Sequence, residues 1–239
     1  MMPCSDKIIV FASFVRRYQV FYVYLHGDFQ LFDSSTCQLI NLSTNKLVNL
    51  NIYMVYEFLA EGFEDIEALA PVDILRRGGV EVKTVSITGS EYVKSAHGVT
   101  VKADTVFENV DSYDDADLLL LPGGMPGSLN LKNHDGVKKV VSEHNEKGRY
   151  IGAICAAPSV LGALGLLKGK KVTCYPGFEK YLDGAEYTAQ LFTVDGNIIT
   201  GKGPAASFPY AYRLLSLFRD GDDVKAIADG MIFSDLMAK

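Results

Sequence analysis

The amino-acid sequence predicts an α/β fold in which a mostly parallel sheet is covered by helices on both faces. Short runs of consecutive apolar residues recur along the chain, and such runs are typical of strands that are buried on both faces. Segments with helical spacing alternate with these runs from Met54 onward. Of the 239 residues, 48% are apolar, which is enough for a large buried core.

The elements after Met54 follow one another in a regular order. Glu61-Gly62 turns the chain after the first apolar run, Gly78-Gly79 ends the first helix at Arg77, and Asp195-Gly196 predicts a hairpin. Strands are expected at residues 55–60, 80–87, 118–121, 150–154 and 171–174. Helices are expected up to Arg77, at 135–147, at 156–167 and twice more toward the C-terminus.

Residues 1–53 differ from the rest, because they are rich in aromatic and β-branched residues and show no clean helical or strand period. Segment 8–25 is the membrane candidate, but Arg16 and Arg17 interrupt it, and each costs roughly 2.5–3.5 kcal/mol at a bilayer centre. No small-residue cleavage site of a signal peptide follows. We expect 1–53 to be an N-terminal extension of doubtful order or a gene-model artefact, and 54–239 to form the main domain.

Composition argues against several classes of partner. The formal net charge of −6 disfavours nucleic acid and anionic membranes. The four cysteines, Cys4, Cys37, Cys155 and Cys174, form no C-x-x-C pair, and the four histidines are too scattered for a zinc site. We therefore expect free thiols in a reducing, cytoplasmic compartment and no metal; a mitochondrial location is the alternative if residues 1–53 are genuine.

The strongest chemical signal is a cysteine between a buried strand and a helix of small residues, in the segment Tyr-Ile-Gly-Ala-Ile-Cys-Ala-Ala-Pro. Small neighbours allow a tight turn with a strained backbone at Cys155. Free N–H groups and the positive end of the helix dipole would favour the thiolate. The alternative is that Cys155 is only a small buried apolar residue.

A glycine-rich loop follows the buried strand at 118–121, in Leu-Pro-Gly-Gly-Met-Pro-Gly. Gly123 and Gly124 let backbone N–H groups approach a ligand closely, which makes the loop a candidate oxyanion site. It lacks the Gly-Lys-Ser/Thr ending of a phosphate loop. The alternative is an ordinary glycine-rich turn.

Glu67 is the candidate acid in the first helix. It shares a stripe with Ala70 and Ile74 at helical spacing, so its carboxyl group is expected to be desolvated and to favour the protonated form. Pro71 has no N–H, which leaves the Glu67 carbonyl without its helical partner and predicts a kink. The alternative is a solvated surface glutamate.

Together these segments resemble the ThiJ/PfpI superfamily, in particular its DJ-one-like branch, from Met54 to about Phe218. The Glu-Asp-Ile-Glu helix, the Leu-Pro-Gly-Gly loop, the Ala-Ile-Cys-Ala-Ala-Pro elbow and Lys202-Gly203-Pro204 occur in family order. The resemblance implies a flavodoxin-like three-layer sandwich of the class I glutamine amidotransferase type. It also implies a homodimer and no cofactor.

The resemblance places the nucleophile at Cys155 and the acid that hydrogen-bonds it at Glu67. The oxyanion donors would be the N–H groups of Gly124 and Ala156, with Gly123 beside them. It implies a glyoxalase or deglycase acting on methylglyoxal-type carbonyls or on glycated proteins. The alternative is a non-catalytic redox sensor or chaperone whose Cys155 is oxidised to sulfinate.

The sequence departs from the family pattern at several positions. Ala156 stands where the protease-like branch has a histidine, and Tyr175 stands where related proteins carry an active-site histidine. Tyr175, Pro204 and His97 are candidate pocket residues, although a solvent-exposed loop histidine is the alternative for His97. Glu57 is unexpected, because a charge in a buried central strand is expensive unless it is paired.

Overall fold

A computed structural model describes the backbone of five strands between residues 9 and 49 and the continuous segment 53–237. The chain divides into two compact units, Met1–Ile52 and Tyr53–Lys239. Within the described residues, no helix is both long enough and apolar enough to cross a membrane. Cys4 and Cys37, and with them the thiol prediction at these two positions, lie outside the described residues.

The described part of the first unit is an antiparallel sheet in which each strand pairs with the next along the chain. Residues 1–53 show no clean strand period, but their richness in aromatic and β-branched residues matches strand propensity. The assignment of 1–53 as an extension stays a prediction. The strands are β1 (Ile9–Val15), β2 (Tyr18–Leu25), β3 (Asp28–Asp33), β4 (Gln38–Asn41) and β5 (Lys46–Asn49).

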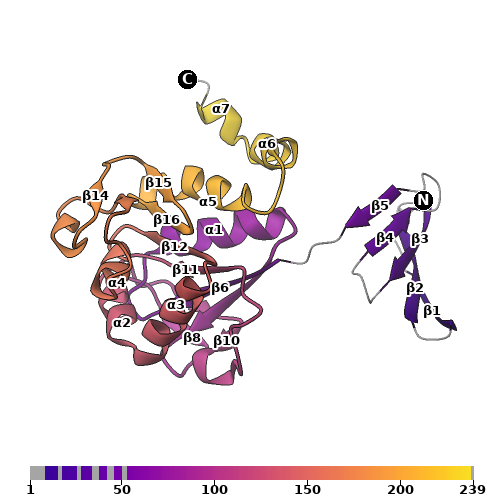
Figure 1. The fold of residues 1–239 in the computed structure, drawn as a ribbon, viewed down its shortest axis with the longest axis horizontal. Helices are drawn as coiled ribbons and strands as arrows, with labels where there is room; N and C mark the ends of the chain where they lie inside the picture. Colours follow the sequence, from indigo (N-terminus) through magenta and orange to yellow (C-terminus); the bar gives the residue numbers. More distant parts are fainter. Residues whose placement is uncertain are drawn as a thin grey trace. The chain divides into compact units, whose positions relative to one another are not determined.

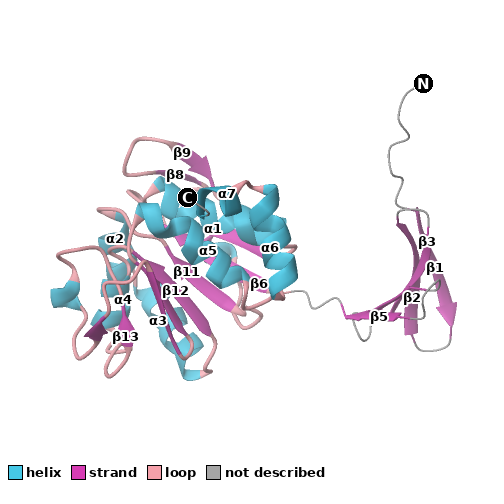
Figure 2. Ribbon diagram, turned by 90° about the horizontal axis from the view of Figure 1, so that it is seen from above, coloured by secondary structure: helices cyan, strands magenta, loops and turns pink. Residues whose placement is uncertain are grey.

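The second unit is built on a seven-stranded sheet (Figure 2). All its pairings are parallel except that of the last two strands, which form the hairpin predicted at Asp195-Gly196. Across the sheet the strands are β10 (Thr105–Val106), β7 (Glu81–Ser86), β6 (Met54–Leu59), β11 (Leu118–Leu121), β12 (Tyr150–Ile154), β16 (Ile198–Gly201) and β15 (Phe192–Asp195).

Helices cover both faces of this sheet (Figures 1 and 2). Strand β11 is buried on both sides, since Leu118 and Leu120 join one hydrophobic core and Leu119 and Leu121 join the other. The predicted α/β sandwich is therefore confirmed. One face carries α1 (Asp65–Arg77), α5 (Ser207–Leu215), α6 (Gly221–Gly230) and α7 (Phe233–Met237), and the other carries α2 (Gly127–Asn133), α3 (Asp135–Glu146) and α4 (Pro158–Ala163).

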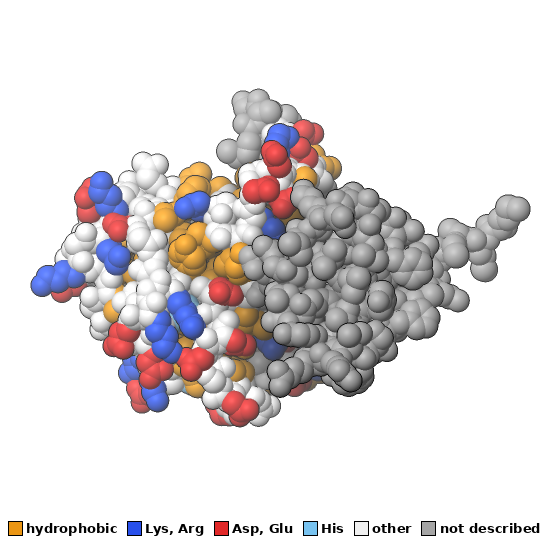
Figure 3. Space-filling model, turned by 45° about the vertical axis from the view of Figure 1, so that its right-hand side comes forward, with side chains coloured by type: hydrophobic (Ala, Val, Ile, Leu, Met, Phe, Trp, Pro, Cys, Tyr) orange, Lys and Arg blue, Asp and Glu red, His pale blue; other side chains and the backbone are white. Residues whose placement is uncertain are grey.

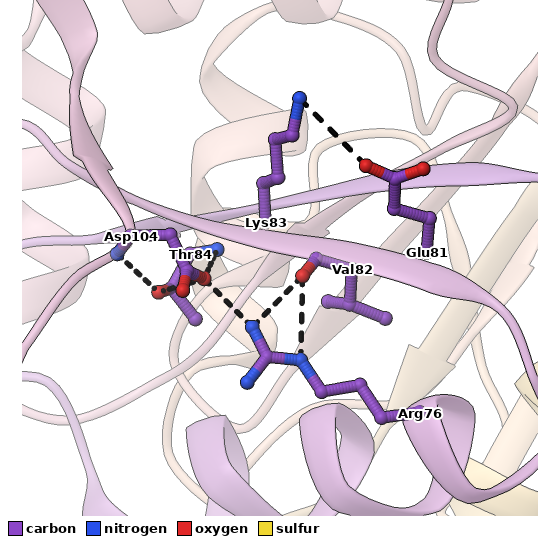
Figure 4. Close-up of polar contacts among 6 residues, drawn as sticks. All are labelled: Arg76, Glu81, Val82, Lys83, Thr84 and Asp104. Carbon is purple, nitrogen blue, oxygen red and sulfur yellow. Dashed lines mark hydrogen bonds and ion pairs between the residues drawn. The ribbon is translucent and has the colours of Figure 1, made fainter. Parts of the chain in front are cut away.

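Helix α1 is fixed at both ends. At its start, the Glu64 side chain accepts a 2.8 Å hydrogen bond from the backbone N–H of Glu67. At its end, Arg76 donates to the carbonyl of Val82 in β7 and to the carboxylate of Asp104 (Figure 4). The assigned helix runs through Pro71 without interruption. Helix α1, which carries Glu67, is therefore held by side-chain hydrogen bonds at both of its ends.

Several short elements differ from the sequence prediction. The helix expected at 156–167 covers only Pro158–Ala163, because Gly165 and Gly169 follow it with positive φ angles. Toward the C-terminus the structure has three helices rather than the expected two. The strand expected at 171–174 ends at Val172. That strand is β13 (Lys171–Val172). The sequence prediction missed short elements that have no clear period: β8 (Tyr92–Lys94), β9 (Thr100–Lys102), β14 (Glu186–Tyr187) and the short helices η1 (Phe107–Asn109), η2 (Glu179–Tyr181) and η3 (Pro204–Ala206).

Charged side chains are mixed on the surface of the second unit. On the face drawn in Figure 3, acidic and basic groups lie among apolar and uncharged ones, and the described part of that face shows no large field of one sign. The absence of a nucleic-acid partner stays a prediction from the net charge of −6.

Candidate active site

Cys155 lies at the end of the central strand β12, in a tight turn. Its φ of 64° is in the left-handed region, which costs a non-glycine residue of order 1–3 kcal/mol. Main-chain bonds on both sides hold this conformation: the N–H of Cys155 donates to Gly201 at 2.9 Å, and its carbonyl accepts from Tyr175 at 2.8 Å. The thiol is 8% exposed. The geometry is that of a nucleophile elbow.

The loop after β11 lies directly against Cys155, and side chains would not fit there. A Cβ on Gly123 would fall 2.2 Å from Glu67 Oε2 and 2.6 Å from the Cβ of Cys155. Gly124 has a φ of 89°, and a Cβ there would fall 2.4 Å from the backbone N of Glu64. The N–H of Glu64 also donates to the Gly123 carbonyl at 3.0 Å, so this loop and the start of α1 form one unit.

Glu67 is only 1% exposed, which excludes the solvated surface alternative. Neither of its carboxyl oxygens has a hydrogen bond of ordinary geometry within the described residues. Burial, together with the charge of Glu64, raises the pKa of Glu67 to about 7, although the Cys155 thiol and the Gly123 N–H act in the opposite direction. The side chain can therefore gain and lose a proton near neutral pH.

The thiol of Cys155 does not have the lowered pKa that the sequence analysis expected. Burial raises its pKa, and the charge of Glu67 raises it further, whereas the N–H groups of Gly124 and Ala156 lower it. Burial and the charge of Glu67 outweigh the N–H groups on which the expectation of a lowered pKa rested. Cys155 therefore lies between a carboxyl group whose charge disfavours the thiolate and two N–H groups that favour it.

Tyr175 and the loop at Gly203-Pro204 border Glu67 on the outer side. A Cβ on Gly203 would fall 3.2 Å from the Tyr175 ring and 4.0 Å from Glu67 Oε1, so the three groups meet at one point. Tyr175 is 46% exposed, and Pro204 begins η3. Two of the three candidate pocket residues are thus brought to the site.

The third candidate, His97, lies in the exposed turn between β8 and β9. Its Nδ1 is 2.8 Å from Asp65 Oδ2, and this hydrogen bond raises the pKa of His97 above its ordinary value. Glu64, Asp65 and His97 offer ligand atoms within 4.8 Å of one another. Glu64 already caps α1 and Asp65 already bonds His97, so we assign no metal to them.

Tyr210 is a neighbour of the site that the sequence gave no reason to select. It is 1% exposed on α5, and its hydroxyl lies against Gly152 in β12. Burial raises its pKa, and the charges of Glu57 and Glu67 raise it further, so it lies near both acids. Two hollows, of about 280 and 680 Å³, share Val110, Asp111, Ser112 and Asp114, and none of the candidate site residues lines them.

A buried cysteine in a left-handed elbow, faced by a glutamate and by glycine-loop N–H groups, defines a class of α/β proteins with a reactive cysteine. The DJ-1/PfpI family model matches residues 54–217, and the chain belongs to that family.

Relatives and solved structures agree with this assignment. The chain is 39% identical over 160 residues to protein DJ-1 homolog B of Arabidopsis thaliana, covering 66% of this chain but only 36% of that protein. It is 32% identical over 165 residues to a deglycase of Pyrococcus abyssi, covering 67% of this chain and 96% of the relative. Drosophila melanogaster DJ-1beta superposes with a TM-score of 0.73 at 31% identity, over 76% of this chain and 98% of that structure.

Proposed function

We propose that the second unit is a cofactor-independent enzyme of the glyoxalase or deglycase type, which acts on methylglyoxal-type carbonyls or their protein adducts. The observation that carries the proposal is the pairing of the Cys155 thiol with a buried Glu67 whose pKa is about 7. The archaeal relative named as a deglycase supports the same chemistry.

The first step would form a covalent adduct. The Glu67 carboxylate accepts the thiol proton while Cys155 Sγ bonds to the aldehyde carbon of methylglyoxal. The carbonyl π electrons move to oxygen, and the N–H groups of Gly124 and Ala156 stabilise that oxyanion. Protonation of the oxygen by Glu67 completes a neutral hemithioacetal and restores the carboxylate.

The second step would isomerise and release the product. Glu67 removes the hydrogen on the former aldehyde carbon, an enediol forms, and the proton returns to the neighbouring carbon, which leaves a thioester of lactate on Cys155. Water then cleaves the thioester, giving lactate and the free thiol. The balance is methylglyoxal plus water to lactate, and no redox partner is needed.

Tyr175 would close the outer side of this site in place of the histidine of related proteins. Its ring lies next to Gly203, and Gly203 lies next to Glu67. Glu67 would therefore carry the proton transfers alone, with Tyr175 forming the outer wall beside the adduct.

The test is the consumption of methylglyoxal and the formation of lactate by the full chain. We expect Cys155→Ala to abolish turnover and Glu67→Gln to lower it by about 10²–10⁴-fold. Cys174→Ala is the matched control, because Cys174 is a fully buried thiol in the other hydrophobic core. Unchanged turnover in Cys155→Ala would refute the proposal.

A second candidate function is redox sensing through oxidation of Cys155 to sulfinate. Glu67 is the observation in its favour, since its protonated form could donate to a sulfinate oxygen that the Gly124 and Ala156 N–H groups also face. Mild peroxide should then add two oxygens to the wild type and none to Cys155→Ala, without any carbonyl turnover. The homodimer and the cytoplasmic location stay predictions.

A further inference from the structure

A small pocket lies beside the candidate active site, and the chemistry proposed above does not use it. Its volume is about 130 Å³, well above the ~15 Å³ that one water molecule requires. It lies between α2, α4 and the segment around η2, and its main lining residues are Met125, Ser128, Leu129, Lys132, Phe178 and Tyr181.

The walls of this pocket continue the segments that surround Cys155. Met125 follows the oxyanion-loop residue Gly124 directly in the chain. Ser159, which also lines the pocket, donates from its hydroxyl to the Ala156 carbonyl at 2.6 Å. The N–H of Phe178 donates to the carbonyl of Tyr175 at 3.0 Å. A molecule in the pocket would therefore lie next to the site rather than in it.

A buried serine, Ser128, lines this pocket. Ser128 is 1% exposed, and its Oγ has no hydrogen-bond partner within the described residues. Buried polar groups in folded proteins are nearly always hydrogen-bonded, but this Oγ is closed off from solvent, so it adds no contact for a ligand in the pocket. The neighbouring walls, Met125, Leu129 and Phe178, are apolar.

Positive charge gathers over one wall. The ammonium group of Lys132 lies 5.3 Å from the centre of the Tyr181 ring, and that of Lys180 lies 5.0 Å from it. Neither lysine forms an ion pair with a carboxylate in the described part of the chain. Apolar walls and an ammonium group without a carboxylate partner together fit an aliphatic chain that ends in a carboxylate.

We propose that this pocket is a subsite for the distal part of the carbonyl substrate, and that it binds a short aliphatic chain ending in a carboxylate paired with Lys132. The preferred substrates are then 2-oxoaldehydes that carry a distal carboxylate, rather than methylglyoxal itself. This substrate assignment rests on the proposed function, whereas the binding of the carboxylate does not.

The binding test uses the full-length Cys155→Ala protein, so that no turnover interferes, and titrates it with hexanoate while backbone amide NMR shifts are followed. We expect saturable shifts at residues 125–132 and 178–181, and weaker responses to hexylamine and to hexan-1-ol. Lys132→Gln should weaken hexanoate binding by about 5–10-fold. Leu129→Asp should abolish it, because this half-exposed position would then repel the carboxylate.

The matched control is Lys139→Gln, which removes a lysine on α3 that does not line the pocket and should leave binding unchanged. The absence of saturable shifts at the pocket, an equal response to hexylamine, or an unaffected Lys132→Gln variant would overturn the subsite.

The activity test compares methylglyoxal with 5,6-dioxohexanoate, which bears the same reactive group and a distal carboxylate. We expect a 3–10-fold lower KM for 5,6-dioxohexanoate in the wild type, and no difference between the two substrates in Lys132→Gln. Hexanoate binding without turnover of either carbonyl would refute the enzyme but leave the subsite standing. Turnover with equal KM values would leave the enzyme and refute the subsite's role in substrate choice.

Discussion

Two glutamates in this protein have the same burial and different surroundings. Glu57 in strand β6 and Glu67 in helix α1 are each 1% exposed, each has an unpartnered carboxyl oxygen, and each influences Tyr210. Burial raises the pKa of Glu57 well above its ordinary value, and only the charge of Arg76 acts against this. Glu67 instead has a thiol and a backbone N–H beside it.

The comparison shows that burial alone does not make an acid functional. Burial and the charge of Arg76 act on the Glu57 carboxyl group, and its Oε2 has no hydrogen-bond partner among the described residues, so this group lowers stability. The pKa of Glu67 is about 7, and the Cys155 thiol lies next to it, which makes Glu67 the better candidate for a functional acid. The two positions therefore predict opposite responses to substitution.

The largest effect on carbonyl turnover is expected from a substitution at Gly123, whose backbone lies against Glu67. Gly123→Ala places a methyl group within 2.6 Å of both Glu67 Oε2 and the Cβ of Cys155, so either the loop or the acid must move. We expect at least a 100-fold loss of carbonyl turnover, measured as kcat/KM. Gly221→Ala is the control, because a Cβ at that position meets nothing within 4 Å. An active Gly123→Ala variant would contradict the assigned site.

Glu67→Gln should change how stability depends on pH. The pKa of Glu67 is about 7 in the folded protein against an ordinary value of 4.5, so the folded state binds a proton that the unfolded state releases. Wild-type stability should fall by about 3 kcal/mol between pH 4.5 and pH 8 through this group, and Glu67→Gln should lack that fall. Urea unfolding of the wild type and of Glu67→Gln at pH 4.5 and pH 8 measures this fall in stability. If the stability of both proteins changed equally with pH, Glu67 would not have a raised pKa in the folded protein.

Glu57→Val should stabilise the protein without affecting catalysis. The substitution removes a buried, unpartnered carboxyl group from the central sheet, and we expect a gain of about 1–2 kcal/mol. Because the pKa of Glu57 is raised, the gain should grow as the pH rises above 4.5. Thermal and urea unfolding at pH 5 and pH 8 test this, with turnover as the control. A loss of stability would mean that Glu57 has a partner in solution.

The smallest effect is expected at Arg76, the charge that lowers the pKa of Glu57. Arg76→Gln removes the contacts to Asp104 and Val82 shown in Figure 4 and should cost about 0.5–1 kcal/mol, because the ion pair is nearly half exposed. Arg77→Gln, which breaks a similarly exposed pair with Asp73, is the control and should cost less. An equal cost in both variants would show that the contact to Val82 contributes nothing.

The sequence predicted the parts of the fold that depend on local pattern. The strands at 118–121 and 150–154 were recognisable because their residues are apolar on both faces, and the cysteine at the end of the second strand drew attention through its small neighbours. Glu67 was selected correctly as a desolvated acid because its helical stripe is apolar.

The electrostatics of the site could not be predicted in the same way. The pKa of Cys155 depends on Glu67 and on the Gly124 N–H, which come from segments far away in the sequence. Tyr210 lies near Glu57 and Glu67 because of how α5 packs on the sheet, and the sequence pattern of α5 does not predict this position. The short hairpin that carries His97 was missed because it has too few residues for a period.

The bond between the Glu64 N–H and the Gly123 carbonyl has a consequence for the time course of folding. It joins the start of α1 to the loop after β11, and Cys155 comes from a third segment, at the end of β12. Non-local contacts of this kind form late, since the chain must first close long loops. Recovery of Cys155 reactivity after dilution from denaturant should therefore mark the completion of the second unit, later than the recovery of its helices.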